Sequence, residues 1–310
     1  MTIQNKIDRA RAAFEQISDY TQEQVDKLVY ESAKIIYENA EPLAKMAVEE
    51  TRLGSYEDKI GKNTGTAAAF WDYLKDKKSV GIINEDPSIG LIEAAHPIGV
   101  IGAITPATNP TVTPLGNFMH ALKGKNAIII SPAPRAEKTS TKTVDLIREA
   151  LAKNGAPEDL IQIVNDVTIE KSQELMANCD LVIATGGSGL TKAAYSSGTP
   201  AYGVGPGNPP VIIDRGYDLK DAAENSIIAV ASDNGILCDG DNLLLYPQDL
   251  EAEFFEEFRK AGAVVFDNAD DVAKFRDALF ENGKVRPGLV GKDTNVIAEA
   301  AGYNLPEGTK

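Results

Sequence analysis

The sequence predicts an α/β protein built on a doubly wound parallel sheet that is preceded by helices. From Gly99 onward, short runs that are apolar on both faces alternate with segments of helical periodicity, which is the pattern of right-handed βαβ units. Residues 5–76, in contrast, follow helical periodicity. A chain of 310 residues is long enough for two domains.

The N-terminal segment predicts an amphipathic helix, and we assign its apolar face to core packing rather than to docking on a partner. That face comprises Ile3, Ile7, Ala10, Phe14 and Ile17. Thr21 is the expected cap of a second helix, and Gly54 is the expected stop of a later one. Two strands are expected next, at residues 80–83 and 90–94.

The parallel sheet is predicted from four apolar runs, at residues 100–104, 127–130, 160–164 and 181–184. The helices expected after these runs cover residues 113–123, 137–153, 169–178 and 188–196. A further βαβ-like pattern predicts strands at 243–246 and 264–266, with helices over 249–261 and 270–281. The doubly wound part therefore extends to about residue 235, and a second α/β region follows it.

The composition excludes several classes of protein. Thirty-one Lys and Arg against 46 Asp and Glu leave a net charge of −15, which is unsuited to binding nucleic acid. No run approaches the roughly 20 apolar residues that span a bilayer, so no membrane partner is expected. The two cysteines, Cys179 and Cys238, make a disulfide framework implausible and indicate the cytoplasm. His96 and His120 lack partners at ligand spacing, so no metal is expected.

Ligands of open α/β sheets bind at the carboxyl ends of the strands, and two such ends here are unusual. After the run at 181–184 comes the small-residue turn formed by Gly186, Gly187 and Ser188, which leads directly into a helix. Glycines permit a close backbone approach, and free N–H groups at a helix start favour a phosphate. The alternative is a tight turn without a ligand.

The run at 100–104 is followed by a loop that two prolines, Pro106 and Pro110, make rigid. Asn109, between them, offers a side-chain amide that could donate to a developing oxyanion. The alternative is an Asx-type turn residue before proline.

Cys238 follows a glycine-containing turn and precedes the polar segment 239–242. Cys179 instead adjoins an apolar run, as structural cysteines do. Because the thiolate is the reactive form of cysteine, Cys238 in its loop is the candidate nucleophile. The acidic residues just after it, Asp239 and Asp241, count against thiolate formation.

Four segments taken together resemble the CoA-acylating branch of the aldehyde dehydrogenase superfamily. In chain order they are TPATNPT at 105–111, ATGGSGLTKAAYSSG at 184–198, AYGVGPGN at 201–208 and DNGILC at 233–238. The similarity runs from about Tyr20 to the last residue. Within the branch, the sequence looks most like the CoA-dependent succinate-semialdehyde dehydrogenases and the acylating acetaldehyde dehydrogenases.

The resemblance implies a role for each matching residue. Cys238 matches the nucleophile that adds to the aldehyde carbonyl, and Asn109 matches the oxyanion donor. The positions implied for binding NAD or NADP are Thr105, Pro106, Ser131, Pro132, Gly186, Gly187 and Ser188. The implied fold is a dinucleotide-binding domain with its N-terminal helices over residues 1–235, followed by the first portion of a catalytic domain over residues 236–310.

The resemblance also implies the acyl acceptor. Hydrolytic members of the superfamily carry a glutamate that activates water, and its matching position here, 35 residues before Cys238, is Gly203. Without that base, a thiol such as CoA is a better acceptor than water. The implied reaction converts a short-chain aldehyde (succinate semialdehyde or acetaldehyde), CoA and NAD(P)⁺ reversibly into acyl-CoA and NAD(P)H.

The sequence departs from the family in two places. Asp239 stands where relatives usually carry a small neutral residue, so a negative charge lies beside the nucleophile. Related chains continue well past the end of the match, so we expect a truncated protein whose full-length form is a homo-oligomer. The alternatives are a non-catalytic dinucleotide-binding or assembly subunit, and a phosphate-ester reductase of related fold. Arg135 either binds a 2′-phosphate or is a solvated charge, so NAD and NADP both remain open.

Overall fold

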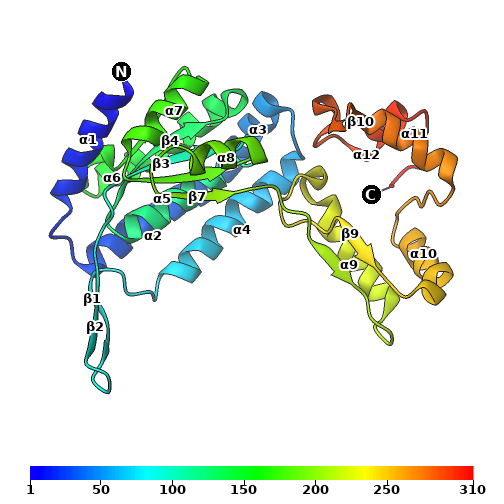
Figure 1. Ribbon diagram of the computed structural model, residues 1–310, viewed down its shortest axis with the longest axis horizontal. Helices are drawn as coiled ribbons and strands as arrows, with labels where there is room; N and C mark the ends of the chain where they lie inside the picture. Colours follow the sequence, from blue (N-terminus) through cyan, green and yellow to red (C-terminus); the bar gives the residue numbers. More distant parts are fainter. Residues whose placement is uncertain (310) are drawn as a thin grey trace. The chain divides into compact units, whose positions relative to one another are not determined.

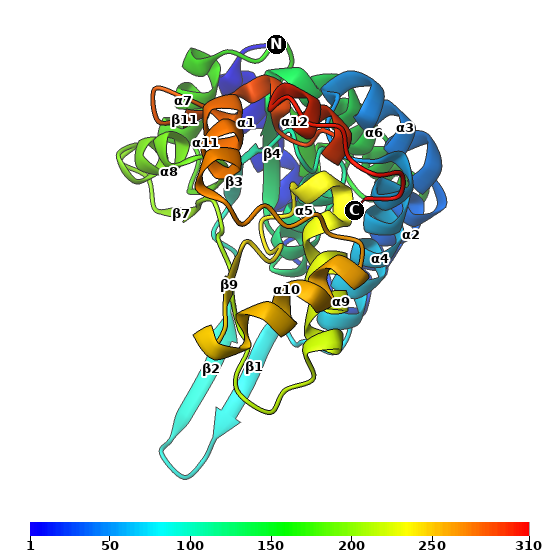
Figure 2. The ribbon, with the colours of Figure 1, turned by 90° about the vertical axis from the view of Figure 1, so that its right-hand side faces the viewer.

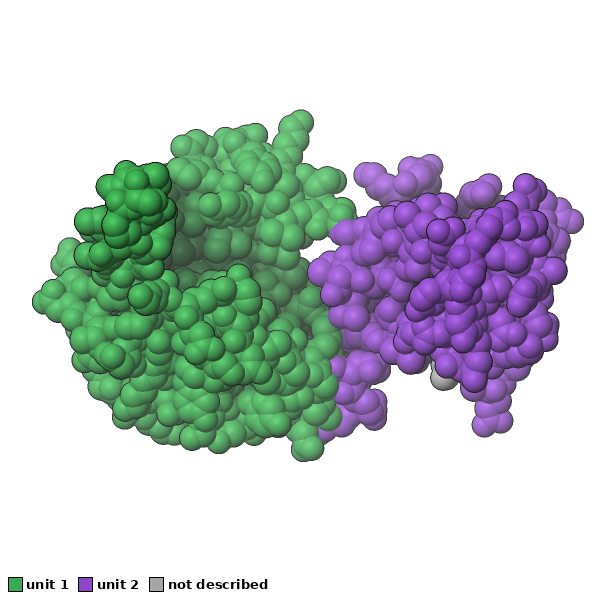
Figure 3. All heavy atoms as spheres, turned by 90° about the horizontal axis from the view of Figure 1, so that it is seen from below, with its two compact units in different colours: residues 1–51, 59–206 green, residues 52–58, 207–310 purple. Residues whose placement is uncertain are grey.

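The computed structural model describes residues 1–309 and divides the chain into two compact units (Figure 3). Unit 1 comprises residues 1–51 and 59–206, and unit 2 comprises residues 52–58 and the chain from Gly207 onward. The division at residues 206 and 207 lies upstream of the predicted domain boundary, so the turn at 232–235 belongs to unit 2. The assignment of functional domains about residue 235 stays a prediction.

The N-terminal region is helical, as predicted. Its helices are α1 (Ile3–Gln16), α2 (Gln22–Glu38), α3 (Ala40–Thr51) and α4 (Tyr56–Leu74). Thr21 caps α2 in a capping box, because its hydroxyl accepts from the Gln24 N–H while the Gln24 side chain accepts from the Thr21 N–H. Ile3 and Ile7 of α1 belong to the main core and α1 lies against β4 (Ala127–Pro132), which confirms the packing role of its apolar face.

The sheet of unit 1 has five parallel strands in the order β5-β4-β3-β6-β7. Its remaining strands are β3 (Val100–Thr105), β5 (Ile161–Ile163), β6 (Leu181–Thr185) and β7 (Ala201–Val204). The connecting helices are α5 (Val112–Lys123), α6 (Glu137–Lys153), α7 (Ile169–Asn178) and α8 (Ser188–Tyr195), with 3₁₀ turns η1 (Pro134–Ala136) and η2 (Glu158–Leu160). Since the chain starts at the central strand, winds to one edge and returns to the other side of β3, the sheet is doubly wound as predicted.

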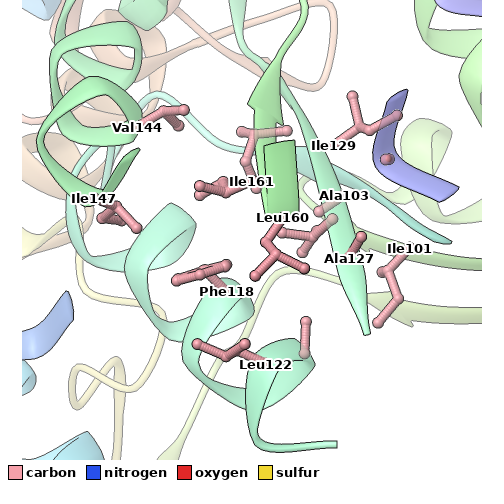
Figure 4. Packing of buried hydrophobic residues seen from close by; sticks show 14 of the residues in the cluster. Ile101, Ala103, Phe118, Leu122, Ala127, Ile129, Val144, Ile147, Leu160 and Ile161 are labelled. Atoms are coloured by element: carbon pink, nitrogen blue, oxygen red, sulfur yellow. The ribbon is translucent and has the colours of Figure 1, made fainter. Parts of the chain in front are cut away.

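Both faces of this sheet are covered. Figure 4 shows Phe118 of α5 and Ile147 of α6 directed at the strands from one side, while Ile129 faces the other way, toward α1. Every residue of β3 and β4 is buried, which explains why their sequences are apolar on both faces.

A hairpin of β1 (Gly81–Asp86) and β2 (Leu91–Ala95) precedes the sheet, as predicted. It extends away from the rest of unit 1 (Figures 1 and 2). Its apolar side chains are largely uncovered, with Ile82, Ile89 and Ile92 exposed to 52%, 71% and 64%.

Unit 2 contains a βαβ element in which β8 (Pro210–Ile212) pairs in parallel with β9 (Leu243–Leu245). Between them lie α9 (Leu219–Ala231) and the 3₁₀ turn η3 (Ser232–Gly235). The remaining elements are η4 (Gln248–Leu250), α10 (Glu251–Lys260), α11 (Ala269–Leu279), β10 (Phe280–Glu281), β11 (Lys284–Val285), η5 (Pro287–Leu289) and α12 (Thr294–Ala300). The βαβ element and α10 share a small hydrophobic core. It includes Ala223 and Ile227 of α9 and Phe254 and Phe258 of α10.

The predicted strand at 264–266 is wrong, because this segment is irregular. A strand requires a hydrogen-bonded neighbour, and no strand of the described residues pairs with it. Its residues pack irregularly instead: Val265 contacts the small core of unit 2, and the ring of Phe266 lies 4.6 Å from that of Phe275 and 5.0 Å from that of Tyr303.

Within residues 1–309, no helix has both the length and the apolar character needed to cross a membrane. The same residues contain no cluster of three or more His, Cys, Asp or Glu side chains that could hold a metal ion.

Candidate active site

The residues of unit 1 that the sequence analysis singled out meet at the carboxyl edge of the sheet. In the ladder, Ile104 pairs with Ser131 on one side and with Ala184 on the other, and Ala184 pairs with Gly203. One position further along, Thr105 pairs with Pro132. The structure therefore places on one edge the strand-end residues Thr105, Pro106, Ser131, Pro132, Gly186, Gly187 and Ser188.

The centre of this edge is the switch point of the sheet. The connection after β3 leads to β4 on one side, whereas β6, the other neighbour of β3, continues to β7. Diverging connections leave a crevice at such a point, and ligands of doubly wound proteins bind there. Thr105 and Gly186, at the ends of β3 and β6, flank this position.

Four helices, α5 to α8, start at or near this edge, and they differ in how their N-termini are satisfied. Glu50 caps α6, because its two carboxylate oxygens accept from the Lys138 and Thr139 N–H groups at 2.8 Å each. Thr168 caps α7 through its hydroxyl. The cap of α8 is Gly187, which has no side chain and therefore makes no side-chain cap bond. α5 has no side-chain cap at Thr111 either, but its Thr113 N–H donates to the Asn109 carbonyl at 3.3 Å and its Pro114 has no N–H. The N-terminus of α8 is thus the one of these four that keeps most of its first N–H groups for an outside anion.

The Ser131 hydroxyl is fully buried and lies 2.9 Å from the hydroxyl of Ser172, which itself donates to the Thr168 carbonyl. This contact ties the end of β4 to the first turn of α7. Ser131 therefore shapes the edge of the sheet through α7.

Asn109 lies in the loop between β3 and α5, which is held from a neighbouring helix. The ammonium of Lys59, on α4, donates to the Thr108 carbonyl at 3.1 Å. Together with Asn63 and Thr111, these residues line a hollow of about 10 Å³, enough for about one water molecule. The loop is therefore fixed immediately before Asn109.

Several polar atoms around this loop are buried without a hydrogen-bond partner among the described residues. They are Thr105 Oγ1, Asn109 Oδ1, Thr111 Oγ1 and Asn117 Nδ2. A buried polar atom without a partner costs roughly 1–3 kcal/mol, and such atoms are rare enough in native proteins to need an explanation. Three of these atoms lie between the end of β3 and the residue before α5, and the fourth lies within α5, so the unsatisfied polar groups gather around the loop that carries Asn109.

Gly203, at the position of the water-activating glutamate in hydrolytic relatives, has no room for a side chain. A Cβ there would lie 2.6 Å from Thr191 Cγ2 and 2.8 Å from Tyr195 Cε2, both on α8. The Gly203 N–H also donates to the Tyr195 hydroxyl at 3.1 Å. The space beside β7 is therefore filled by α8.

The two cysteines have opposite environments. Cys238 lies in unit 2 with its side chain exposed. Cys179 is buried in unit 1, and this burial raises the pKa of its thiol to about 11. Of the two, Cys238 has the exposed thiol, while Cys179 is buried in the core as expected, with its Sγ 3.3 Å from the Leu181 carbonyl oxygen.

Two groups of residues that contact the candidate residues, one in each unit, were not singled out from the sequence. One is the pair Thr191 and Tyr195, whose closure of the space at Gly203 depends on the packing of α8 on β7. The other is the segment 52–58, which binds the turn before Cys238. A sequence signal existed for the second, since Ser55 and Asp58 have the spacing of a capping box before α4.

Comparison with known proteins agrees with this architecture. The model of the aldehyde dehydrogenase family matches residues 1–274. A curated relative, the succinate-semialdehyde dehydrogenase (acetylating) of Clostridium kluyveri, is 47% identical over all 310 residues, which correspond to 68% of its own length.

Solved structures give the same result. The acetylating aldehyde dehydrogenase of Geobacillus thermoglucosidasius superposes with a TM-score of 0.95 at 38% identity, over 99% of this chain and 68% of the other. The propionaldehyde dehydrogenase of Rhodopseudomonas palustris with bound propionyl-CoA superposes with a TM-score of 0.88 at 29% identity, over 100% of this chain and 69% of the other. The fold described above is thus shared over nearly the whole chain.

Proposed function

The chain belongs to the acylating branch of the aldehyde dehydrogenase family, and from this premise we propose that it transfers the acyl group of a short-chain aldehyde to CoA through a thioester on Cys238. The observation that carries the proposal is the closed space at Gly203. A family member that cannot place a carboxylate there lacks the base that activates water. A thiol, which needs far less help to ionise near neutral pH, is then the favoured acceptor.

In the proposed reaction the Cys238 thiolate adds to the aldehyde carbonyl carbon and forms a tetrahedral thiohemiacetal. The side-chain amide of Asn109 donates to the oxygen that becomes negative. A nicotinamide cofactor, when bound at the carboxyl edge, would supply the hydride acceptor that the oxidation of this intermediate to a Cys238 thioester requires. The Cys238 thioester is then attacked by the CoA thiolate, which leaves as acyl-CoA and returns Cys238 as a thiolate.

The residues at the carboxyl edge of unit 1 fit a dinucleotide cofactor. The uncapped N-terminus of α8, at Gly187 and Ser188, suits a pyrophosphate, because helix N–H groups and the helix dipole both favour an anion. Thr105 supplies a buried hydroxyl without a partner at the adjacent strand end. We propose that these residues, with Pro106, Ser131, Pro132 and Gly186, hold NAD or NADP.

The acyl group is proposed to be succinyl or acetyl. The Clostridium kluyveri relative is named a succinate-semialdehyde dehydrogenase, which supports a succinyl group. The Geobacillus thermoglucosidasius structure is named an acetylating aldehyde dehydrogenase, which supports an acetyl group. We further propose a homo-oligomer in the cytoplasm. The exposed isoleucines of the β1–β2 hairpin support the association of copies of the chain. The two free thiols fit the reducing environment of the cytoplasm.

The test is the intact mass of the purified chain after incubation with acetyl-CoA or succinyl-CoA. An acyl adduct that appears on the wild type and not on Cys238→Ala is expected, and the CoA ester that reacts faster identifies the acyl class. Cys179→Ala is the matched control, and it should acylate like the wild type. A wild type that binds NADH without forming an adduct would refute the proposal and support a dinucleotide-binding subunit.

A further inference from the structure

The turn that precedes Cys238 has an unfavourable backbone. Asp233, Asn234 and Gly235 all adopt positive φ angles, of 51°, 55° and 69°. A left-handed conformation costs roughly 1–2 kcal/mol for a residue with a side chain, although Asn and Asp tolerate it best. Two such residues in succession persist only where their surroundings hold them in place.

The segment 52–58 provides one part of these surroundings. The Ser55 N–H donates to Asp233 Oδ1 at 3.0 Å, and the Asp233 N–H donates to Asp58 Oδ2 at 2.9 Å. Each of the two carboxylates thus accepts from the backbone of the other segment. The Ser55 hydroxyl also donates to Asp58 Oδ2 at 2.7 Å, which fixes that carboxylate. Since Asp233 is completely buried, water cannot replace these bonds.

Gly54 makes this contact sterically possible. A Cβ on Gly54 would lie 1.8 Å from Asp233 Oδ1, so no other residue fits there while Asp233 keeps its place. The Gly54 N–H donates to the Gly291 carbonyl at 3.1 Å, and the Asn234 amide donates to the same carbonyl at 3.3 Å and to Asp293 Oδ1 at 3.0 Å. The turn is therefore bonded to a second segment as well.

The contacts continue to the cysteine itself. A Cβ on Gly291 would lie 2.8 Å from Ile236 Cγ2, two residues before Cys238. A Cβ on Gly207 would lie 1.9 Å from the Cys238 carbonyl oxygen, so the backbone of Cys238 rests directly on Gly207. Cys238 is thus held on one side by Gly207 and, through the turn, by segments 52–58 and 291–293 on the other.

We propose that Asp233, seated against Gly54, is a positioning residue that holds the Cys238 thiol in its reactive orientation. The inference rests on the proposed function of Cys238 as the acyl-accepting nucleophile. Asp233 does not touch the reacting atoms; it fixes the backbone five residues upstream. Displacing it lets the turn relax, so the thiol spends less time in a geometry that can attack, and the rate of acylation falls.

The test compares two glycine substitutions. Gly54→Ala places a methyl group against Asp233, whereas Gly283→Ala, at nearly the same φ (73° against 72°) and also in unit 2, meets nothing within 4 Å. The measured quantity is the rate of acyl-adduct formation on Cys238 against the concentration of acyl-CoA, followed by intact mass. We expect Gly54→Ala to lower the maximal rate about tenfold or more, with the half-saturating concentration unchanged, and Gly283→Ala to change it less than twofold.

A second pair keeps the proposal testable if Gly54→Ala fails to fold. Asp233→Asn retains an oxygen acceptor for the Ser55 N–H and tolerates the left-handed conformation, so it should recover most of the rate that Asp233→Ala loses. If Asp233 only positions the thiol, its loss slows acylation in every molecule. Both variants should then still reach the final yield of one adduct per chain.

Three results would overturn the inference. Equal rates in both glycine variants would show that the contact at Gly54 is irrelevant to the thiol. A lower final yield at an unchanged rate, with no rescue by Asp233→Asn, would show a role in folding alone. No adduct on the wild type would remove the proposed function and this inference with it, whereas an adduct on the wild type combined with equal rates removes only the inference.

Discussion

At the scale of single residues, each of the two units contains a glycine whose role a sequence pattern does not display. Gly203 is small because Thr191 and Tyr195 occupy the adjoining space, and Gly54 is small because Asp233 does. In both cases the glycine is required by the side chain of a residue on another element. The candidate residues Cys238, Asn109 and Gly187 could be found by motif, because their neighbours in sequence carry the signal. The closure of the space at Gly203 could not, since it depends on how α8 lies on β7.

Cys179 gives the first prediction at this scale, and it concerns pH. The folded protein raises the pKa of this thiol to about 11 by burial, while an unfolded chain ionises it near pH 8.5. Between these values the unfolded state releases a proton that the native state retains. The free energy of unfolding therefore falls as the pH rises from about 9 to 11, by up to about 1.4 kcal/mol per pH unit, and is unaffected below pH 8.

Urea unfolding of the wild type and Cys179→Ser at pH 8, 9, 10 and 11 measures this contribution. The serine variant should lose stability less steeply above pH 9, because it has no thiol to ionise. Cys238→Ser, which changes an exposed thiol, serves as the control and should keep the wild-type slope. Parallel curves for all three proteins would show that burial of Cys179 does not couple to stability.

At the scale of elements, the sequence predicted the strands and helices of unit 1 well where an apolar run or a helix cap marks the element. β3, β4 and β6 are short apolar runs that are largely buried, and α6 and α7 have the predicted bounds. The start of α7 is marked in the sequence by its Thr168 cap. β7 was not predicted: it is an edge strand of half-exposed residues interrupted by Gly203. The error at 264–266 has the same origin, since whether an apolar run becomes a strand depends on a neighbour that the run does not encode.

The uncapped start of α8 gives a prediction for an element. Gly187 has an ordinary φ of −69°, and a Cβ at this position would meet nothing within 4 Å, so Gly187→Asn and Gly187→Asp should both fold. Both would cap α8 about equally. Only Asp adds a negative charge where a cofactor pyrophosphate is proposed. The Kd for NADH and for NADPH should therefore be about tenfold higher in the Asp variant than in the Asn variant, a difference of about 1.4 kcal/mol in binding free energy.

Fluorescence titration with each nucleotide measures this difference, and thermal unfolding without ligand confirms that the two variants are equally stable. Since the two side chains have nearly the same size, any loss of close backbone approach is common to both. Equal affinities for the Asn and Asp variants would place the pyrophosphate elsewhere than at α8.

At the scale of the whole molecule, the exposed apolar side chains of the β1–β2 hairpin support association between copies of the chain. Isoleucines exposed to more than half of their surface on a projecting hairpin are unusual for a surface that faces only water. We expect Ile89→Asp combined with Ile92→Asp to reduce the mass measured by light scattering after size exclusion, without lowering the melting temperature. Glu85→Lys, an exposed charge change on the same hairpin, is the control and should keep the wild-type mass. An unchanged mass in the double variant would assign the association to another surface.

The path of the chain between the two units has a consequence for how this protein can be divided. The chain enters unit 2 at Arg52, leaves it after Asp58 and returns to it at Gly207. A fragment that starts at Gly207 would lack the Ser55 amide and the Asp58 carboxylate that Asp233 bonds, and a fragment that ends at Pro206 would carry both without Asp233. No single cut therefore yields two complete units. Recombination at residues 206 and 207 would therefore join a segment 52–58 from one parent to an Asp233 turn from the other, and the two would have to remain complementary.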